Sequence, residues 1–266
     1  MDILDRPYEL APEHIAYYQK NRFIKLKHVF DAETIAHYNA VIGAKVEELN
    51  TQKKELKDRN TYEKAFLQLF NLWLEDPDIK TLIFSKRLGR IAAELMQVEG
   101  VRLYHDQALF KEAGGGYTPW HADQFYWPLQ TDKCITAWIP LQAVPLNMGP
   151  LEFSAQSHQI VEGRELEIGD ESEDFISNRL RITDFEHLIE PFDLGEVSFH
   201  SGWVFHRAGP NQTDETRKVM TIIYMDKAMR LKDPENDWQV NDWNTWCPGA
   251  KVGELIDTHL NPVLYP

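Results

Sequence analysis

A histidine and an aspartate stand one residue apart in the stretch Thr118-Pro119-Trp120-His121-Ala122-Asp123-Gln124-Phe125-Tyr126-Trp127-Pro128. Successive side chains of a β-strand point to opposite faces, so residues i and i+2 share a face. We therefore expect the His121 imidazole and the Asp123 carboxylate to converge. One further histidine would complete the two-histidine, one-carboxylate set that is typical of non-haem Fe(II) sites.

Four histidines that follow this stretch are candidates for the third ligand: His158, His187, His200 and His206. His206 ends a predicted strand just before a turn at Gly209-Pro210-Asn211, and Arg217 opens the next strand eleven residues later. If these two strands pair as a hairpin, His206 and Arg217 would face the same cavity. The residues alone leave the choice among the four histidines open.

An arginine near such a metal would have a physical task. Three protein ligands on one face of an octahedron leave three positions, enough for a bidentate 2-oxo acid and dioxygen. The distal carboxylate of 2-oxoglutarate then needs a bidentate partner, which a guanidinium supplies and an ammonium does not.

In an ordered set of motifs the chain resembles the phytanoyl-CoA dioxygenase family of Fe(II)/2-oxoglutarate oxygenases. Trp120 to Asp123 matches its HxD motif, Gly149 to His158 its Gly-x-Leu and Gly-Ser-His segment, and Gly195 to Asn211 its distal histidine segment. Arg217 matches the arginine that binds 2-oxoglutarate. The resemblance covers about the whole chain, although Gln156 replaces the glycine of Gly-Ser-His.

The resemblance implies a set of site residues and cofactors. Fe(II), 2-oxoglutarate and O2 would take part, and the products would include succinate and CO2. Asp123 is retained, which argues against halogenation. The implied iron ligands are His121, Asp123 and His206, and the implied 2-oxoglutarate residues are Arg217, Gln107, Trp138 and Thr118.

Three aromatic residues, Phe125, Tyr126 and Trp127, follow the HxD motif directly. They could be ordinary core residues, or they could form an aromatic substrate wall at the mouth of a barrel. We expect them at the substrate site.

The predicted fold is mainly β with flanking helices, around a cupin-like double-stranded β-helix, or jelly roll. We predict one domain, residues 1–266, with a helical buttress at about 1–100, the jelly-roll core at about 101–230, and a packed C-terminal tail. On the last core strand, Arg217, Val219, Thr221 and Ile223 should face one side and Lys218, Met220, Ile222 and Tyr224 the other.

Local patterns predict the individual elements. Helices are expected from Pro12, after Asp31, in the apolar run 66–73 and at 86–98, and strands at 23–30, 101–111, 134–144, 195–206 and 217–229. Residues 160–190 are acidic and poorly periodic, as in a lid or a mobile loop. Trp238, Trp243 and Trp246 should pack the tail onto the body.

The formal net charge of −14 argues against a nucleic acid or an anionic membrane as partner. An acyl-CoA carries phosphates, so the same charge favours a small metabolite as substrate. The two cysteines, the lack of an apolar run of membrane length and the lack of a secretory pattern predict a cytoplasmic location.

A second class of function stays open, a cupin-like metal-binding protein with a sensing or non-oxidative role. Arg217 discriminates between the two, because a protein that does not bind 2-oxoglutarate has no need of the arginine.

Overall fold

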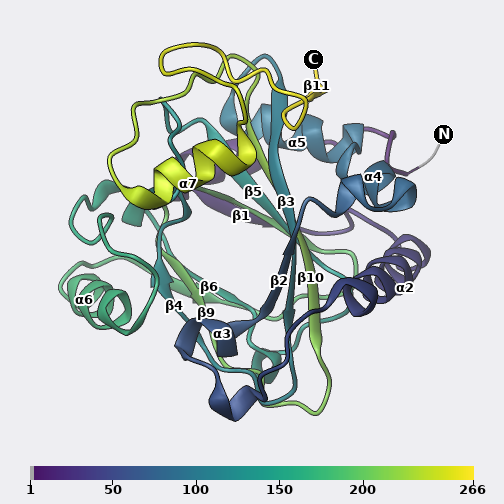
Figure 1. The fold of residues 1–266 in the computed structure, drawn as a ribbon, viewed down its shortest axis with the longest axis vertical. Coiled ribbons are helices and arrows are strands. Elements are labelled where there is room, and N and C mark those ends of the chain that lie inside the picture. Colours follow the sequence, from purple (N-terminus) through teal and green to yellow (C-terminus); the bar gives the residue numbers. More distant parts are fainter. Residues whose placement is uncertain (1–2) are drawn as a thin grey trace.

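Two antiparallel β-sheets face each other in the computed structural model, which describes residues 3–266 (Figure 1). The larger sheet has the order β1-β8-β5-β10-β3-β11, with β2 paired to β3, and the smaller has the order β4-β9-β6-β7. This is the predicted jelly roll. The strands are β1 (Phe23–Leu26), β2 (Leu67–Phe70), β3 (Val101–Lys111), β4 (Thr118–His121), β5 (Cys134–Pro140), β6 (Leu151–Ser154), β7 (His187–Ile189), β8 (Val197–Ser201), β9 (His206–Ala208), β10 (Arg217–Asp226) and β11 (Val263–Tyr265).

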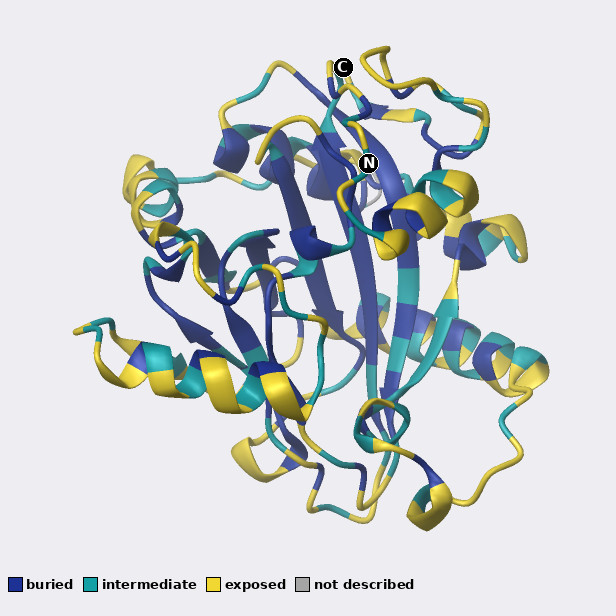
Figure 2. Ribbon diagram, turned by 60° about the vertical axis from the view of Figure 1, so that its left-hand side comes forward, coloured by how far each residue is buried: buried dark blue, intermediate teal, exposed yellow. Residues whose placement is uncertain are grey.

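Helices cover the outer face of the larger sheet. The chain forms α1 (Pro12–Asn21), α2 (Ala32–Leu49), α3 (Thr61–Ala65), α4 (Pro77–Ile83), α5 (Lys86–Met96), α6 (Asp170–Arg181) and α7 (Asp237–Trp246). α2 begins as predicted, because the Asp31 carboxylate accepts a hydrogen bond from the Thr34 amide at 2.9 Å. Its buried stripe turns inward and its exposed residues face solvent (Figure 2).

Strand β10 lies at the centre of the larger sheet, paired with β3 and β5. Met220, Ile222 and Tyr224 pack into the core beneath the helices. Arg217 and Thr221 line a cavity on the opposite face. The predicted alternation is confirmed, and it makes this strand apolar on both faces.

The apolar run 66–73 is not the predicted helix. Residues Leu67–Phe70 form β2, which pairs with β3, and residues Leu72–Leu74 form a short 3₁₀ helix. Asn71 separates them with a φ of 50°, a left-handed conformation that ends the strand. The backbone of β3 supplies the hydrogen bonds that a helix would have made within itself.

The predicted strand 195–206 is two strands in different sheets. β8 pairs with β1 and β5, and β9 pairs with β4 and β6. The chain crosses from one sheet to the other at residues 202–205, so β9 and β10 do not pair as a hairpin. His206 and Arg217 instead come from opposite sheets to the same cavity.

Residues 160–190 contain ordered elements, not only a loop. α6 packs beside β4, and β7 pairs with β6. The C-terminal tail places α7 over one end of the two sheets (Figure 1). Cys134 and Cys247 are both buried and unpaired. None of the helices in residues 3–266 has the length and apolar character needed to cross a bilayer. The division into one domain with three parts stays a prediction.

Candidate metal and co-substrate site

Three side chains converge between β4 and β9. His121 ends β4, His206 begins β9, and the two residues are paired across the ladder. Asp123 stands not on the strand but at the start of the 3₁₀ turn Asp123–Phe125. Its Oδ1 nevertheless lies 3.4 Å from His121 Nε2 and 3.6 Å from His206 Nε2. The three potential ligand atoms are all within 4.8 Å of one another.

The hydrogen bonds of both histidines define their tautomers. His121 Nδ1 lies 2.7 Å from the Pro119 carbonyl oxygen, and His206 Nδ1 lies 3.1 Å from that of Val204. A carbonyl only accepts, so each Nδ1 carries the proton and each Nε2 presents a lone pair. Two lone pairs thus face a carboxylate oxygen with no proton to share. A cation placed among them would turn this repulsion into coordination, so the residues present fit a metal ion.

The charge states of Asp123 and His206 also suit the binding of a metal ion. Burial alone would raise the pKa of Asp123, but the imidazoles of His206, His121 and His200 around the carboxylate hold this pKa well below its usual range. Burial lowers the pKa of His206, so its imidazole is neutral. The set therefore offers one anionic oxygen and two neutral nitrogens, the donors of a facial Fe(II) site.

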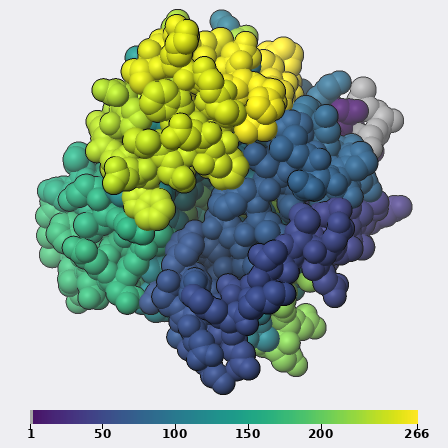
Figure 3. Space-filling model, viewed as in Figure 1, coloured from purple at the N-terminus to yellow at the C-terminus, as the bar shows by residue number. Residues whose placement is uncertain are grey.

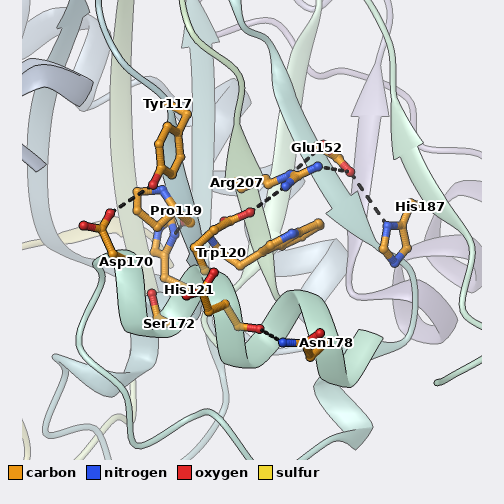
Figure 4. A network of polar contacts seen from close by, with 12 residues as sticks. Tyr117, Pro119, Trp120, His121, Glu152, Asp170, Ser172, Asn178, His187 and Arg207 are labelled. Atoms are coloured by element: carbon orange, nitrogen blue, oxygen red, sulfur yellow. Dashed lines mark hydrogen bonds and ion pairs between the residues drawn. The ribbon is translucent and has the colours of Figure 1, made fainter. Parts of the chain in front are cut away.

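The other three candidate histidines are not part of the three-ligand set, although His200 lines the same cavity. His200, on β8, places Nε2 3.3 Å from Asp123 Oδ2, behind the carboxylate. His187 stands on β7, 3.8 Å from Glu152, on the outside of the smaller sheet (Figure 4). His158 belongs to a short 3₁₀ helix after β6 and does not line the cavity.

One cavity of about 390 Å³ contains the converging residues. Its size is that of a small-molecule site. Phe125 is not in its lining; the ring is buried, and its carbonyl accepts a hydrogen bond from Gln239 at 3.0 Å. The sequence-predicted residues that the cavity brings together are His121, Asp123, His206, Arg217, Gln107, Trp138, Thr118, Tyr126 and Trp127.

Arg217 is a buried cation without an acidic partner. Its guanidinium donates to the Gly149 carbonyl and lies 5.4 Å over the Trp138 ring. Its Nε has no hydrogen-bond partner, and no carboxylate of residues 3–266 forms an ion pair with it. Burial lowers its pKa to about 9. An uncompensated guanidinium at the edge of a cavity is suited to receive an anionic ligand.

Hydrogen bonds link several polar side chains in and around the cavity wall. Gln68 donates to the Gln107 side chain, and the Tyr62 hydroxyl donates to Gln68 Oε1 at 2.8 Å. Thr118 Oγ1 accepts from the buried amino group of Lys111 at 3.3 Å. Gln68 was missed by the sequence analysis, because a helix over residues 66–73 gives no reason for it to face β3.

The outer walls of the cavity were also missed, apart from Tyr126 and Trp127. The missed wall residues come from α3, β2, β3 and α7 and from the segments directly after α3 and before α6, which are far apart in the chain. Figure 3 shows the surface hollowed beneath α7, between the yellow-green C-terminal part and the blue part that contains β2. The additional wall residues are Tyr62, Phe66, Phe70, His105, Ile168, Trp238, Asn241, Asp242 and Trp246.

A polar network holds α6 against the outside of the smaller sheet (Figure 4). Glu173 accepts from the Trp120 amide at 2.8 Å and from the Arg207 guanidinium at 2.7 Å. Arg207 also donates to Glu152 at 2.8 Å. The residue before His121 is thus fixed from outside the barrel, which holds the histidine's backbone in place.

Comparison with known proteins agrees with the fold and with the geometry of the site. The sequence profile of the family described as Phytanoyl-CoA dioxygenase (PhyH) matches residues 18–219. A protein of Stutzerimonas stutzeri, named as a probable alpha-ketoglutarate-dependent hypophosphite dioxygenase, is 24% identical over 155 residues. That match covers 55% of this chain and 52% of the relative, so the chain spans about half the length of the relative.

Solved structures share the fold over nearly the whole chain. The non-heme alpha ketoglutarate dependent carbocyclase SnoK of nogalamycin biosynthesis has a TM-score of 0.77 at 19% identity, covering 97% of this chain and 99% of its own. The epimerase SnoN, in complex with Fe3+, alpha ketoglutarate and nogalamycin RO, has a TM-score of 0.76 at 22% identity, covering 95% and 97%. At these identities the likeness establishes the jelly-roll fold.

Proposed function

Because the chain belongs to the phytanoyl-CoA dioxygenase family, we propose that it is an Fe(II)- and 2-oxoglutarate-dependent dioxygenase. It hydroxylates a small-molecule metabolite and releases succinate and CO2. The observation that carries this proposal is the presence, in one cavity, of a histidine–aspartate–histidine set and a buried arginine without an acidic partner.

His121, Asp123 and His206 hold the iron. Their tautomers and charge states present two nitrogen lone pairs and one carboxylate oxygen at a common point. When bound, Fe(II) with 2-oxoglutarate supplies the O2 activation and the oxidising power that side chains lack. The protein contributes a fixed geometry, because Nδ1 of each histidine is held by a backbone carbonyl two residues earlier.

Arg217 binds the distal carboxylate of 2-oxoglutarate. Its guanidinium is already buried, and its contacts with Gly149 and Trp138 orient it. Binding of the 2-oxoglutarate carboxylate therefore needs little further ordering of the arginine side chain. Trp138 flanks the co-substrate, and Gln107 and Thr118 supply polar groups on the same wall. Tyr126 and Trp127 form part of the substrate wall and keep water out of the inner cavity.

The alternative of a metal-binding protein without oxygenase activity leaves Arg217 unexplained. A buried guanidinium costs free energy unless something compensates its charge, and no carboxylate in residues 3–266 pairs with it. The absence of a nucleic-acid partner is a further part of the proposal, supported by the net charge of −14. A cytoplasmic location is another, supported by the two unpaired cysteines, which suit a reducing compartment.

Anaerobic titration of the Fe(II)-loaded protein with 2-oxoglutarate tests the function. Chelation should produce a weak visible metal-to-ligand charge-transfer band that saturates. Iron binding without the band would remove the oxygenase function and leave the metal-binding alternative in its place.

A further inference from the structure

The outer half of the cavity is an aromatic chamber, defined by Tyr62, Phe70, Tyr126, Trp127, Trp238 and Trp246. The rings lie in contact across elements: the Phe70 and Trp246 centroids are 4.9 Å apart, and those of Tyr126 and Trp238 are 5.8 Å apart. Such walls bind an apolar body through area burial, and their ring faces also attract cations.

A single carboxylate, that of Asp242 on α7, belongs to the wall of this aromatic chamber. It is 9% exposed and accepts a hydrogen bond from the Tyr104 hydroxyl at 3.2 Å and another from the Trp246 side chain. Both donors are neutral, and no lysine, arginine or histidine of residues 3–266 forms an ion pair with it. Burial raises its pKa to about 7.

Another buried carboxylate of the protein does have a cationic partner. Glu196 is also buried, and the Lys25 ammonium lies 3.4 Å from its carboxylate. Among the described residues that line the cavity, His105 is the one base apart from Arg217 and the histidines around Asp123, and its ring lies 4.9 Å from that of Trp246. Burial lowers the pKa of His105 to about 3, so it is neutral and contributes no compensating charge.

Electrostatics make the chamber selective for positive charge. Among the described residues that line the whole cavity, Arg217 is the sole arginine or lysine, and it lies on the inner wall with Trp138. The outer chamber therefore has a carboxylate, aromatic ring faces and no cation. The net charge of −14 adds a long-range attraction for cations.

We propose that the substrate carries a positively charged amino group, which pairs with Asp242 while its apolar body lies between the rings of the aromatic chamber. This inference rests on the proposed function, since it names the substrate class of the same site. It argues against an acyl-CoA, whose phosphates would meet a carboxylate and no lysine or arginine at this end of the cavity.

Two probes of matched shape test the charge requirement: 2-phenylethylammonium and 2-phenylethanol. Both are titrated anaerobically by calorimetry into protein loaded with Fe(II) and 2-oxoglutarate. The ammonium should bind about tenfold or more tightly than the alcohol, as expected for a charge-assisted hydrogen bond in a partly desolvated site. Equal affinities would overturn the proposal.

Asp242→Asn is the decisive variant, because the amide still accepts from Tyr104 but carries no charge. It should reduce the preference for the ammonium to about twofold or less and leave the alcohol's affinity unchanged. Asp242→Glu should retain the preference, which separates loss of charge from loss of structure. Asp233→Asn, at an exposed site before α7, is the matched control and should behave as the parent. A preference that survives in Asp242→Asn would contradict the assignment.

The charge-transfer band, recorded on the same samples, separates this inference from the proposed function. If the band forms but the ammonium has no advantage, the oxygenase function stands and the substrate class is wrong. If the ammonium binds selectively but no band forms, the chamber is not a substrate site and both proposals fail. A panel of amines and their N-acetyl derivatives then completes the test, since succinate release should respond to the amines and not to the acetylated forms.

Discussion

His200 and Asp123 lie in contact at the back of the metal site, with His200 Nε2 3.3 Å from Asp123 Oδ2. The Thr136 hydroxyl reaches the same oxygen at 3.3 Å. Both partners come from the larger sheet, and together they leave Oδ1 facing His121 and His206. The protein thus holds one oxygen of the carboxylate and leaves the other available to bind iron.

This contact predicts that metal affinity depends on residues that do not bind the metal. Thr136→Val removes one hydrogen bond at nearly constant size, and His200→Leu removes the other. Each should weaken Fe(II) binding by about 10- to 100-fold, as outer-shell partners of ligands typically do. Anaerobic titration against a competing chelator measures the change. His187→Gln, on the outside of the smaller sheet, should have no effect, and unchanged affinity in both test variants would show that Asp123 needs no support.

Arg217 should be needed for the binding of 2-oxoglutarate but not for the binding of Fe(II). Arg217→Met removes the guanidinium but keeps an unbranched side chain over Trp138. We expect 2-oxoglutarate affinity to fall about 10- to 100-fold, the cost of losing a charge-assisted pair, with Fe(II) affinity unchanged. The titration of the charge-transfer band measures this. Arg90→Met, which loses an ion pair with Glu94 on the surface helix α5, is the control. Simultaneous loss of iron binding in Arg217→Met would contradict its assigned role.

The sequence predicted those parts of the protein that depend on local patterns. Alternation along Arg217 to Tyr224 was enough to define a strand buried on both faces, and the cap at Asp31 marked the start of α2. The iron-binding motif was recognisable because His121 and Asp123 are neighbours in sequence. The prediction of a helix at 66–73 was wrong because it also used local pattern alone. The apolar spacing suits a helix, whereas the pairing with β3 is a tertiary effect.

The outer chamber could not have been predicted in this way. Tyr62, His105 and Asp242 belong to three segments that only the fold brings together. Asp242 lies in α7, and the sequence of this helix predicts that it packs through its tryptophans. The spacing of those tryptophans does not indicate that the Asp242 carboxylate is buried. His200 was one of the four candidate ligands, and its contact with Asp123 could not be predicted because it depends on how the two sheets bring β8 close to the turn that follows β4.

Asp106 should make stability depend on pH. Its Oδ1 accepts from the Leu72 amide at 2.9 Å, its Oδ2 has no partner, and burial raises its pKa to about 7. The unfolded chain releases this proton near pH 4, so between about pH 4 and 7 the folded state binds more protons. The free energy of unfolding therefore falls as pH rises through this window, by a few kcal/mol at most, since one pKa unit is worth about 1.4 kcal/mol.

Urea unfolding of the parent and of Asp106→Asn measures this effect. The amide keeps an acceptor for Leu72 and does not ionise. The parent's stability relative to the variant should decline from about pH 4 to 7 and stay level above that range. The comparison with Asp106→Asn is necessary because burial raises the pKa of Asp242 to about 7 as well. A difference that does not change with pH would mean that Asp106 is ionised in the folded protein.

We predict that the hydrogen bonds of Glu173 hold the segment 160–190 in place, so that it is not a freely moving lid. Its carboxylate accepts from the Trp120 amide and from Arg207, and the Tyr126 hydroxyl accepts from the Ile168 amide at 2.9 Å. In the parent, the amides of α6 should therefore be protected from hydrogen exchange. Glu173→Ala leaves the Trp120 amide without its partner, which should cost about 1–3 kcal/mol and increase exchange throughout α6.

Glu171→Ala is the matched control, an exposed acid in the same turn of the helix. It should leave exchange unchanged apart from a small effect at the helix N-terminus. If the α6 amides of the parent exchange as fast as those of an unstructured peptide, the anchor at Glu173 does not hold, and the segment opens as a lid. Slow exchange that is lost in Glu173→Ala alone would instead show that this carboxylate fixes α6 to the strand that carries His121.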